Sequence, residues 1–226
     1  MIDVAVMVEP RCHPCLKSVI DNMIMFLNKE TKIMIFHSDL NENFLLSCYK
    51  NNAQIILQKL NRLKNNNLTI TEYNILLTQP TFWNQIDGEY ILVFQTDSCL
   101  CQHIDNININ QFKEYGFVGA PCRSKNDKYN TWRNGGFSLR RKSLILKCLS
   151  RLEANQLVTI NEDKFYTVGC KYIIKPAPYD LSLKFAIEKY YYKNPFGLHK
   201  TWKYIKPFQW DELKTNFPHI GLIFNI

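Results

Sequence analysis

The stretch EYILVFQTD, Glu89 to Asp97, decides the fold of this chain. Its apolar centre, Ile91 to Phe94, is typical of a buried β-strand. Asp97 stands just past the end of this strand. Because α/β proteins bind ligands where buried strands open onto loops, we expect this carboxylate to hold a ligand. The alternative is a turn aspartate that is hydrogen-bonded to nearby backbone amides.

The segments on both sides of this strand alternate between strand and helix patterns. Apolar, β-branched runs predict strands, and apolar residues at helical spacing predict helices. Strands are expected at 2–10, 31–39 and 116–121, and helices at 15–27, 41–51 and 143–152. This alternation is typical of an α/β fold with a parallel sheet.

The remaining segments carry weaker patterns. They predict a surface connection at 61–67, a helix from 73 that Pro80 interrupts, a polar loop at 123–132, a turn at 134–136, a strand at 171–178 and a helix at 182–192. There is no internal repeat, and no linker divides the chain. We therefore expect a single domain.

Composition and charge limit the classes of function. With 46% hydrophobic and 21% charged residues, the chain has the composition of a globular protein. Its net charge of +8 favours anionic partners. Since the basic residues are spread out and no nucleic-acid motif occurs, we expect no nucleic acid, with a basic RNA or DNA binder as the alternative. No secretory signal or membrane-spanning run is found, so a cytoplasmic protein is expected.

Eight cysteines raise the question of a metal site. Free, reduced thiols are the expectation in a chain of this size without a signal. Cys12 and Cys15 have the spacing of half a zinc site, yet no second Cys-x-x-Cys completes the four ligands. Cys99 and Cys101 are the alternative second half.

Two polar groups lie at expected strand ends and turns. Asp97, with Gln95 two residues earlier on the same face, can bind a divalent metal, and the metal can hold a diphosphate. The glycines of Asn134-Gly135-Gly136 allow a ligand to approach the backbone closely, although a plain turn needs the same residues.

Two further groups each contain two adjacent ionisable residues. Glu162 and Asp163 are adjacent carboxylates, of which one can act as general base while the other binds a hydroxyl. Acids at a helix start also stabilise the helix through its dipole. His199 and Lys200 can supply a metal ligand and a phosphate contact, although a lone histidine is more often structural.

Eight segments along nearly the whole chain carry a resemblance to a known family. They are VAVMVEPRCHP, EYNILLTQPTFW, LVFQTDSCLC, FVGAPC, NGGFSLRRK, NEDKFY, KFAIE and NPFGLHK. In this order they resemble the GT-A type glycosyltransferase-like domains of giant viruses and microbes, long catalogued as a domain of unknown function. The abundance of Asn, Ile, Lys and Tyr suggests an AT-rich genome, which agrees with a giant virus.

The resemblance implies one α/β GT-A domain over 1–226, with a mixed central sheet flanked by helices. A Rossmann-like nucleotide-binding half would cover 1–100 and an acceptor-side half 101–226. The implied activity is transfer of a sugar, with inversion, from a nucleotide-sugar donor, a UDP-sugar being favoured, to a glycan or protein-linked acceptor. Gln95 replaces the first acid of the usual Asp-x-Asp motif. A non-catalytic relative that binds nucleotide sugar or glycan is therefore the alternative.

The resemblance also assigns roles to residues. Asp97 matches the last acid of the Asp-x-Asp motif and is expected to hold a divalent metal, Mn²⁺ or Mg²⁺, together with His199. Asp163 is the expected catalytic base and Glu162 its acceptor-binding partner. The residues expected to bind the nucleotide sugar are Glu9, Arg11, Gln95, Thr96, Asp97, Asn134, Gly135, Gly136 and Lys200.

Overall fold

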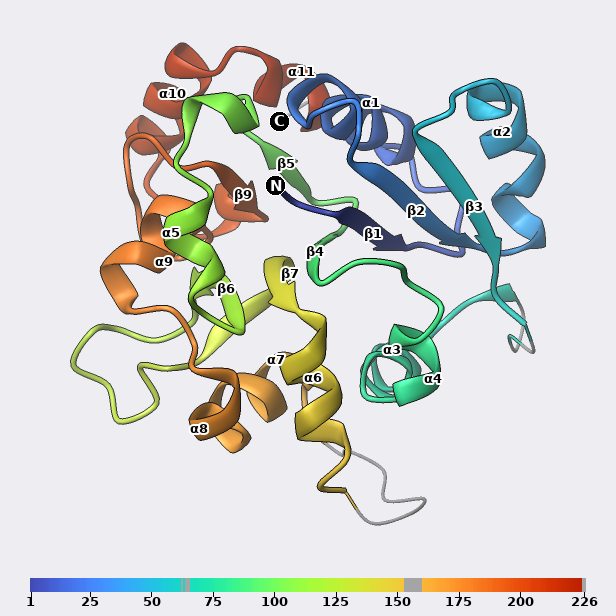
Figure 1. Cartoon of the computed structure of the whole chain (residues 1–226). Coiled ribbons are helices and arrows are strands. Elements are labelled where there is room, and N and C mark those ends of the chain that lie inside the picture. The colour runs from blue at the N-terminus through green and yellow to red at the C-terminus, as the bar shows by residue number, and fades with distance from the viewer. Residues whose placement is uncertain (62, 64–65, 153–159, 225–226) are drawn as a thin grey trace.

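The computed structural model of the chain describes residues 1–61, 63, 66–152 and 160–224 (Figure 1). Its main sheet contains β1 (Val4–Val8), β2 (Lys32–His37), β3 (Ile55–Lys59), β4 (Tyr90–Phe94), β6 (Phe117–Pro121) and β7 (Arg133–Arg141). These strands lie in the order β3-β2-β1-β4-β7-β6. The first four are parallel, whereas β7 runs antiparallel to both of its neighbours. The predicted mixed central sheet is therefore confirmed.

A smaller sheet connects the end of β4 with the C-terminal part of the chain. It consists of β5 (Ser98–Leu100), β8 (Ala186–Ile187) and β9 (Gly197–His199), in the order β5-β9-β8. The antiparallel pairing of β5 with β9 places Ser98 opposite His199. His199 therefore lies beside the residue that follows Asp97, although about a hundred residues separate them along the chain.

Helices cover both faces of the main sheet (Figure 1). One face packs against α1 (Leu16–Phe26), α2 (Asp39–Tyr49), α5 (Asn110–Lys113), α9 (Tyr179–Phe185), α10 (Pro207–Asn216) and α11 (His219–Phe224). The other packs against α3 (Ile70–Leu77), α4 (Pro80–Trp83), α6 (Lys142–Leu149) and α8 (Lys171–Ile174). Alternate residues of β1 point into opposite cores. Ala5 packs on the side of α1, and Val6 packs on the side of α3. This is the pattern of a strand buried on both faces.

The glycine pair was wrongly expected to form a turn. Asn134-Gly135-Gly136 lies inside β7, which is hydrogen-bonded on one side to β4 and on the other to β6. Glycine is unfavourable in a strand because it loses more backbone entropy and packs no side chain. The registered pairs of β7 are Arg133 and Phe137–Arg141, and at the glycines the amides of Gly135 and Gly136 donate instead to Oδ2 of Asp163 and Oδ1 of Asn134.

Two predictions near the C-terminus were also wrong. Residues 171–178 do not form a strand, because 171–174 form α8 and Pro176 makes only a single bridge, to Phe117. The helix expected at 182–192 ends at Phe185, where the chain becomes β8 and pairs with β9. Short apolar runs are compatible with either a strand or a helix, and tertiary pairing decides between them.

The cysteines do not form the zinc site that was considered. All eight lie in the described part of the chain and are free thiols. Cys99 and Cys101 are buried, whereas Cys12 is exposed and donates from Sγ to the carbonyl oxygen of Leu40 at 2.9 Å. Across the described residues, no group of three or more His, Cys, Asp and Glu side chains is arranged to hold a metal ion.

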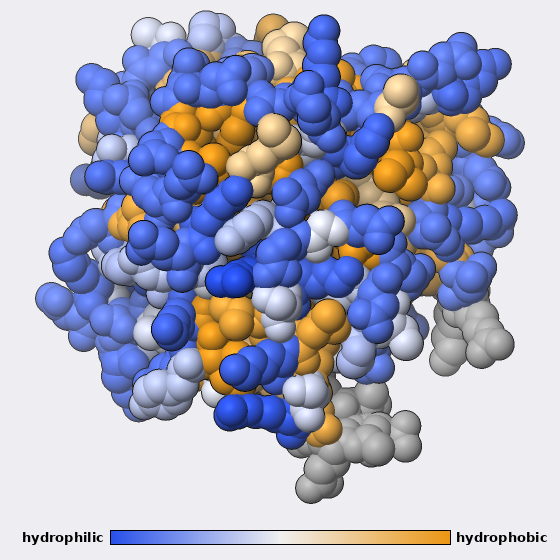
Figure 2. Space-filling view, in the orientation of Figure 1, coloured by the Kyte–Doolittle hydropathy of each residue, from blue (hydrophilic) through white to orange (hydrophobic). Residues whose placement is uncertain are grey.

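The surface in Figure 2 is largely hydrophilic, with hydrophobic residues in separate patches. Among the described helices, none combines the length and apolar character needed to cross a membrane.

Candidate active site

A cleft of about 470 Å³ opens where β1 and β4 end and β7 begins. Ligands of α/β proteins bind at this edge of the sheet, beyond the carboxyl ends of the parallel strands. Every residue that the sequence nominated for the site lines this cleft. They are Glu9, Arg11, Gln95, Thr96, Asp97, Asn134, Gly135, Gly136, Glu162, Asp163, His199 and Lys200.

A tight turn holds Asp97 at the end of β4. The amide of Ser98 donates to the carbonyl oxygen of Gln95 at 3.0 Å, and the amide of Gln95 donates to Oγ of Ser98 at 3.0 Å. The carbonyl oxygen of Asp97 in turn accepts a hydrogen bond from the amide of Lys200 at 2.8 Å. Lys200 adopts a left-handed conformation with φ of 51°, which is uncommon for a residue other than glycine.

Two cations surround the carboxylate of Asp97. Nε2 of His199 lies 3.1 Å from Oδ1, and Nζ of Lys200 lies 3.3 Å from Oδ2. Burial would raise the pKa of Asp97, but the hydrogen bond and charge of His199, followed by Lys200, hold it well below its usual range. Asp97 is therefore ionised and charge-compensated.

A second carboxylate lies on the other side of the His199 ring. Nδ1 of His199 is 3.5 Å from Oε1 of Glu188, which also accepts from the side-chain amide of Asn134 at 3.4 Å. Burial would lower the pKa of His199, but Asp97 and Glu188 together raise it to about 9. A metal ion at Nε2 would therefore have to displace a proton.

Three polar atoms around His199 are the candidates to hold a divalent metal ion. Nε2 of His199, Oδ1 of Asp97 and Oε1 of Gln95 converge, the last lying 3.3 Å from Nε2. Gly136 lets the His199 ring pack directly against β7, since a Cβ there would overlap Nε2 and lie 2.8 Å from Oε1 of Gln95. Mg²⁺ is commonly bound by one or two carboxylates plus substrate phosphates, and Asp97 is the carboxylate of this set. The carboxylate behind Nδ1 is a common orienting partner of a metal-binding histidine.

Asp163 lies in the same cleft in a different environment. Its carboxylate accepts hydrogen bonds from Nε1 of Trp132 at 3.2 Å and from the amides of Gly135 at 3.1 Å and Lys164 at 2.6 Å. Within the described residues, no cationic side chain forms an ion pair with it. Burial, and after it the charge of Glu162, raises the pKa of Asp163 to about 6. A carboxylate with such a pKa suits general base catalysis near neutral pH.

Glu162 is held by a buried arginine. Nη1 and Nη2 of Arg140 each donate at 2.8 Å to one carboxylate oxygen, and the Arg140 side chain is 0% exposed. The amide of Glu162 donates to Oδ1 of Asn74 at 3.1 Å. Glu162 thus lines the cleft with both oxygens already bound, and it fixes the start of α7 (Glu162–Lys164).

The two glycines of β7 connect these two groups of residues. A Cβ on Gly135 would overlap Oε1 of Glu162 and lie 3.1 Å from Cβ of Asp163. The equivalent atom on Gly136 would overlap Nε2 of His199. Since consecutive Cα atoms are about 3.8 Å apart, the Asp97–His199 pair and the Asp163 carboxylate lie against neighbouring residues of one strand.

The end of β1 forms a third part of the cleft. Nε and Nη2 of Arg11 donate to the two carboxylate oxygens of Glu9 at 2.8 and 2.7 Å. Glu9 is buried, whereas the Arg11 side chain is 54% exposed. Asn41 fixes this segment by donating from Nδ2 to the carbonyl oxygens of Glu9 and Arg11.

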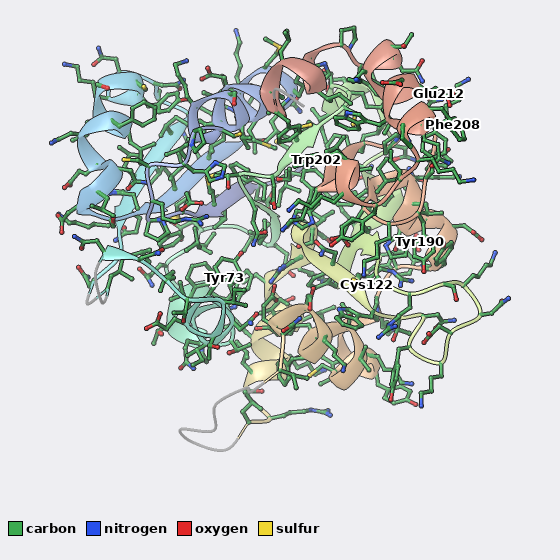
Figure 3. The ribbon with its side chains drawn as sticks, turned by 180° about the vertical axis from the view of Figure 1, so that it is seen from behind. Tyr73, Cys122, Tyr190, Trp202, Phe208 and Glu212 are labelled. Atoms are coloured by element: carbon green, nitrogen blue, oxygen red, sulfur yellow. The ribbon has the colours of Figure 1, made fainter. Side chains whose placement is uncertain are left out.

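Several residues of the cleft were not nominated from the sequence. Among them are Tyr73, Asn74, Glu188 and Tyr204. Tyr73 projects from α3 (Figure 3), and its buried hydroxyl makes no well-formed hydrogen bond within the described chain. Burial raises the pKa of Tyr73. The segments EYNILLTQPTFW and KFAIE contain three of these residues, but nothing in the spacing distinguishes Tyr73 or Glu188 from core positions.

The fold resembles those of solved glycosyltransferases. WbbM, a bifunctional glycosyltransferase, matches with a TM-score of 0.56 at 9% identity, over 98% of this chain and 51% of WbbM. TarS of S. aureus matches with a TM-score of 0.54 at 9% identity, over 99% of this chain and 40% of TarS. The chain thus spans about half the length, or less, of these solved structures. No curated protein matches the sequence.

These matches define the class of fold as GT-A-like, a mixed central sheet flanked by helices that is shared with glycosyltransferases. At this level of identity they show the fold alone. The chain itself belongs to the family described as "Protein of unknown function (DUF5672)", whose model matches residues 58–199, more than half of the chain. The matched range runs from β3 to His199 and includes Asp97, Glu162 and Asp163.

Proposed function

We propose that this protein is a glycosyltransferase that moves a sugar from a nucleotide-sugar donor, a UDP-sugar being favoured, to a glycan or protein-linked acceptor. One observation carries the proposal. A cleft at the carboxyl edge of the sheet contains a charge-compensated aspartate, Asp97, and an aspartate of raised pKa, Asp163, on adjoining parts of its wall. The likeness of the fold to glycosyltransferases supports it.

In the proposed reaction, Asp163 accepts the proton of the acceptor hydroxyl. The hydroxyl oxygen forms a bond to the anomeric carbon as the bond from that carbon to the nucleoside diphosphate breaks, and the diphosphate leaves with the electron pair. A single displacement of this kind inverts the anomeric carbon. Trp132 and the amide of Gly135 hold the Asp163 carboxylate in place for proton transfer.

The donor would bind with its diphosphate toward Lys200 and His199. Lys200 supplies a positive charge against the charge that develops on the leaving group. Gln95, Asp97 and His199 would hold a divalent metal, Mn²⁺ or Mg²⁺, which when bound supplies further charge for the diphosphate. Glu9, Arg11 and Thr96 would bind the nucleoside, and Asn134, Gly135 and Gly136 the sugar.

The test is the release of nucleoside diphosphate from UDP-glucose, UDP-galactose, UDP-N-acetylglucosamine and GDP-mannose, with Mn²⁺ present. We expect release from at least one donor and a rise in melting temperature with the same donor, because ligand binding stabilises the folded state. A chain that neither binds nor hydrolyses any nucleotide sugar would contradict the proposal.

The second candidate is a non-catalytic relative that binds nucleotide sugar or glycan. Gln95 favours it, because this residue supplies a neutral amide where a carboxylate would bind a metal more strongly. In this case a donor raises the melting temperature without any release of nucleoside diphosphate.

A further inference from the structure

Four cations lie close to the cleft without lining it, three of them around Trp132 and Tyr129 and one beside Tyr204, and we call them the basic rim: Arg123, Lys128, Lys164 and Lys189. Arg123 and Lys128 belong to the loop between β6 and β7, whereas Lys164 follows Asp163 directly and Lys189 follows Glu188. In the part of the chain that the structure describes, none of the four lies within 4.0 Å of a carboxylate oxygen.

Aromatic rings, in place of carboxylates, hold these cations. Cζ of Arg123 lies 5.4 Å and Nζ of Lys164 5.3 Å from the ring centre of Trp132. Nζ of Lys128 lies 5.0 Å from the ring of Tyr129, and Lys164 is 5.8 Å from the same ring. Contacts of this kind hold a cation in place and leave its charge without a counterion.

The basic rim borders the proposed base. Trp132, which contacts Arg123 and Lys164, donates from Nε1 to Asp163. Nζ of Lys189 lies 5.4 Å from the ring of Tyr204, which lines the cleft. Burial raises the pKa of Cys122, at the beginning of the loop (Figure 3), and the nearby charges of Asp163 and Glu188 raise it further, whereas those of Lys189 and Arg133 lower it.

Nearby acids do not neutralise the rim. Asp180 pairs with Lys125 at 2.6 Å, and Asp127 makes no ion pair with the rim among the described residues, its carboxylate accepting from the amide of Tyr129 at 2.7 Å. On the opposite part of the cleft the cations are matched, Arg11 with Glu9 and Lys200 with Asp97. The cations of the basic rim, which lie outside the lining of the cleft, are therefore the ones without a carboxylate partner within the described chain.

We infer that the acceptor is an anionic glycan, one that carries phosphate or carboxylate groups. This inference rests on the proposed function, which makes the Asp163 side the acceptor side. A neutral glycan would leave four charges without a partner, whereas an anionic one complements them. A nucleic acid fits less well, because its bases bind by stacking on free aromatic faces and these rings already contact cations.

The inference is tested by direct binding to three immobilised glycans, phosphomannan, oligogalacturonate and dextran, and to a single-stranded DNA oligonucleotide. The rim variant is Arg123→Glu with Lys128→Glu. The control is Lys29→Glu with Lys50→Glu, which makes the same change of charge at exposed positions beside β2 and β3, the opposite edge of the sheet. Melting curves verify that both variants fold.

We expect the wild-type chain to bind phosphomannan or oligogalacturonate at least about tenfold more tightly than dextran, with an affinity that falls as salt is added. The rim variant should lose about tenfold and the control variant less than about twofold. Tighter binding of phosphomannan would indicate that the acceptor carries phosphate groups. Tighter binding of oligogalacturonate would indicate carboxylate groups.

Equal binding of dextran, full retention by the rim variant, equal loss in the control variant or tighter binding of the oligonucleotide would each overturn the inference. These measurements need no turnover. Failure here with donor release intact removes only the anionic acceptor, whereas absence of donor release removes the proposed function itself.

Discussion

Two aspartates in one cleft differ in how their charge is compensated. Asp97 is bound by His199 and Lys200, and its pKa is held low. Among the described residues, Asp163 is bound by neutral donors only and lies beside a second carboxylate, and its pKa rises to about 6. The same residue type therefore suits two roles, a permanent negative charge on one side and a proton acceptor on the other.

The largest effect is expected from removing the proton acceptor. Asp163→Asn should lower the rate of sugar transfer by about 10²–10⁴-fold, the usual contribution of a general base. The amide keeps the size of the side chain, so donor binding and melting temperature should be retained. The measurement is nucleoside diphosphate release at saturating donor and acceptor.

The matched control is Asp105→Asn, since this carboxylate is 71% exposed and away from the cleft. Its rate should equal that of the wild-type chain. Wild-type turnover in Asp163→Asn would show that Asp163 is not the general base. Only the proposed role of Asp97 in donor binding would then remain.

The next largest effect is expected from the buried ion pair between Arg140 and Glu162, the residue before Asp163. Arg140→Met should destabilise the protein by about 3–5 kcal/mol, because it leaves Glu162 as a buried charge without a partner. Removing both charges, as Arg140→Met with Glu162→Gln, should cost less. Chemical unfolding measures both losses.

Arg141 offers the control at the adjacent position. It also pairs with a glutamate, Glu89, at 2.8 Å, but its side chain is 40% exposed. Arg141→Met should therefore change the free energy of unfolding by less than about 1 kcal/mol. Equal losses of unfolding free energy at Arg140 and Arg141 would show that the buried Arg140–Glu162 pair stabilises the protein no more than an exposed pair does.

Substitution of Gly135 or Gly136 by alanine tests each side of the cleft separately. Gly136→Ala places a methyl group against His199 and Gln95, and should weaken binding of nucleoside diphosphate with Mn²⁺ by about tenfold or more. Gly135→Ala places one against Glu162, and should instead lower stability. Calorimetry and melting curves separate the two outcomes.

Gly221→Ala is the control, because its nearest neighbour, Cδ of Lys214, would be an ordinary 3.5 Å away. It lies in α11, where alanine is at least as favourable as glycine. If Gly136→Ala binds nucleotide like Gly221→Ala, the donor does not lie against His199.

A smaller effect is expected from pH. Since the base must be ionised and the pKa of Asp163 is about 6, the rate should fall as the pH drops through 6 and be constant above about 7. The raised pKa also means that the folded state binds the proton more strongly than the unfolded state. Relative to Asp163→Asn, the wild-type chain should therefore gain stability as the pH falls from 6 toward 4. A rate that is flat from pH 5 to 8 would contradict the assignment.

Three strands of the first half were predictable because their composition leaves few alternatives, whereas β3 was not predicted. The runs at 2–10, 31–39 and 89–97 are apolar enough to be buried on both faces, and β1, β2 and β4 occupy them. The strand β7 was not predictable in the same way. Its glycines oppose strand formation locally, and the reason for them, the lack of room beside His199 and Glu162, exists only in the folded chain.

The sequence predicted residues that line the cleft, but it did not predict the contacts among them. A resemblance across separated segments nominated twelve residues, and the cleft contains all of them. The buried partner of Glu162, Arg140, and the partner of His199, Glu188, were not nominated, because each depends on how distant segments meet. Arg140 is a buried residue of β7, and Glu188 was expected inside a helix that ends earlier.

The most direct test of the account is a carboxyl ¹³C NMR titration of aspartate-labelled protein, with Asp97→Asn and Asp163→Asn used to assign the two signals. The account predicts that Asp163 titrates with a midpoint near 6, while Asp97 remains ionised below the ordinary aspartate value of about 3.9. Two aspartates that titrate together near that ordinary value would contradict the division of roles between the two sides of the cleft.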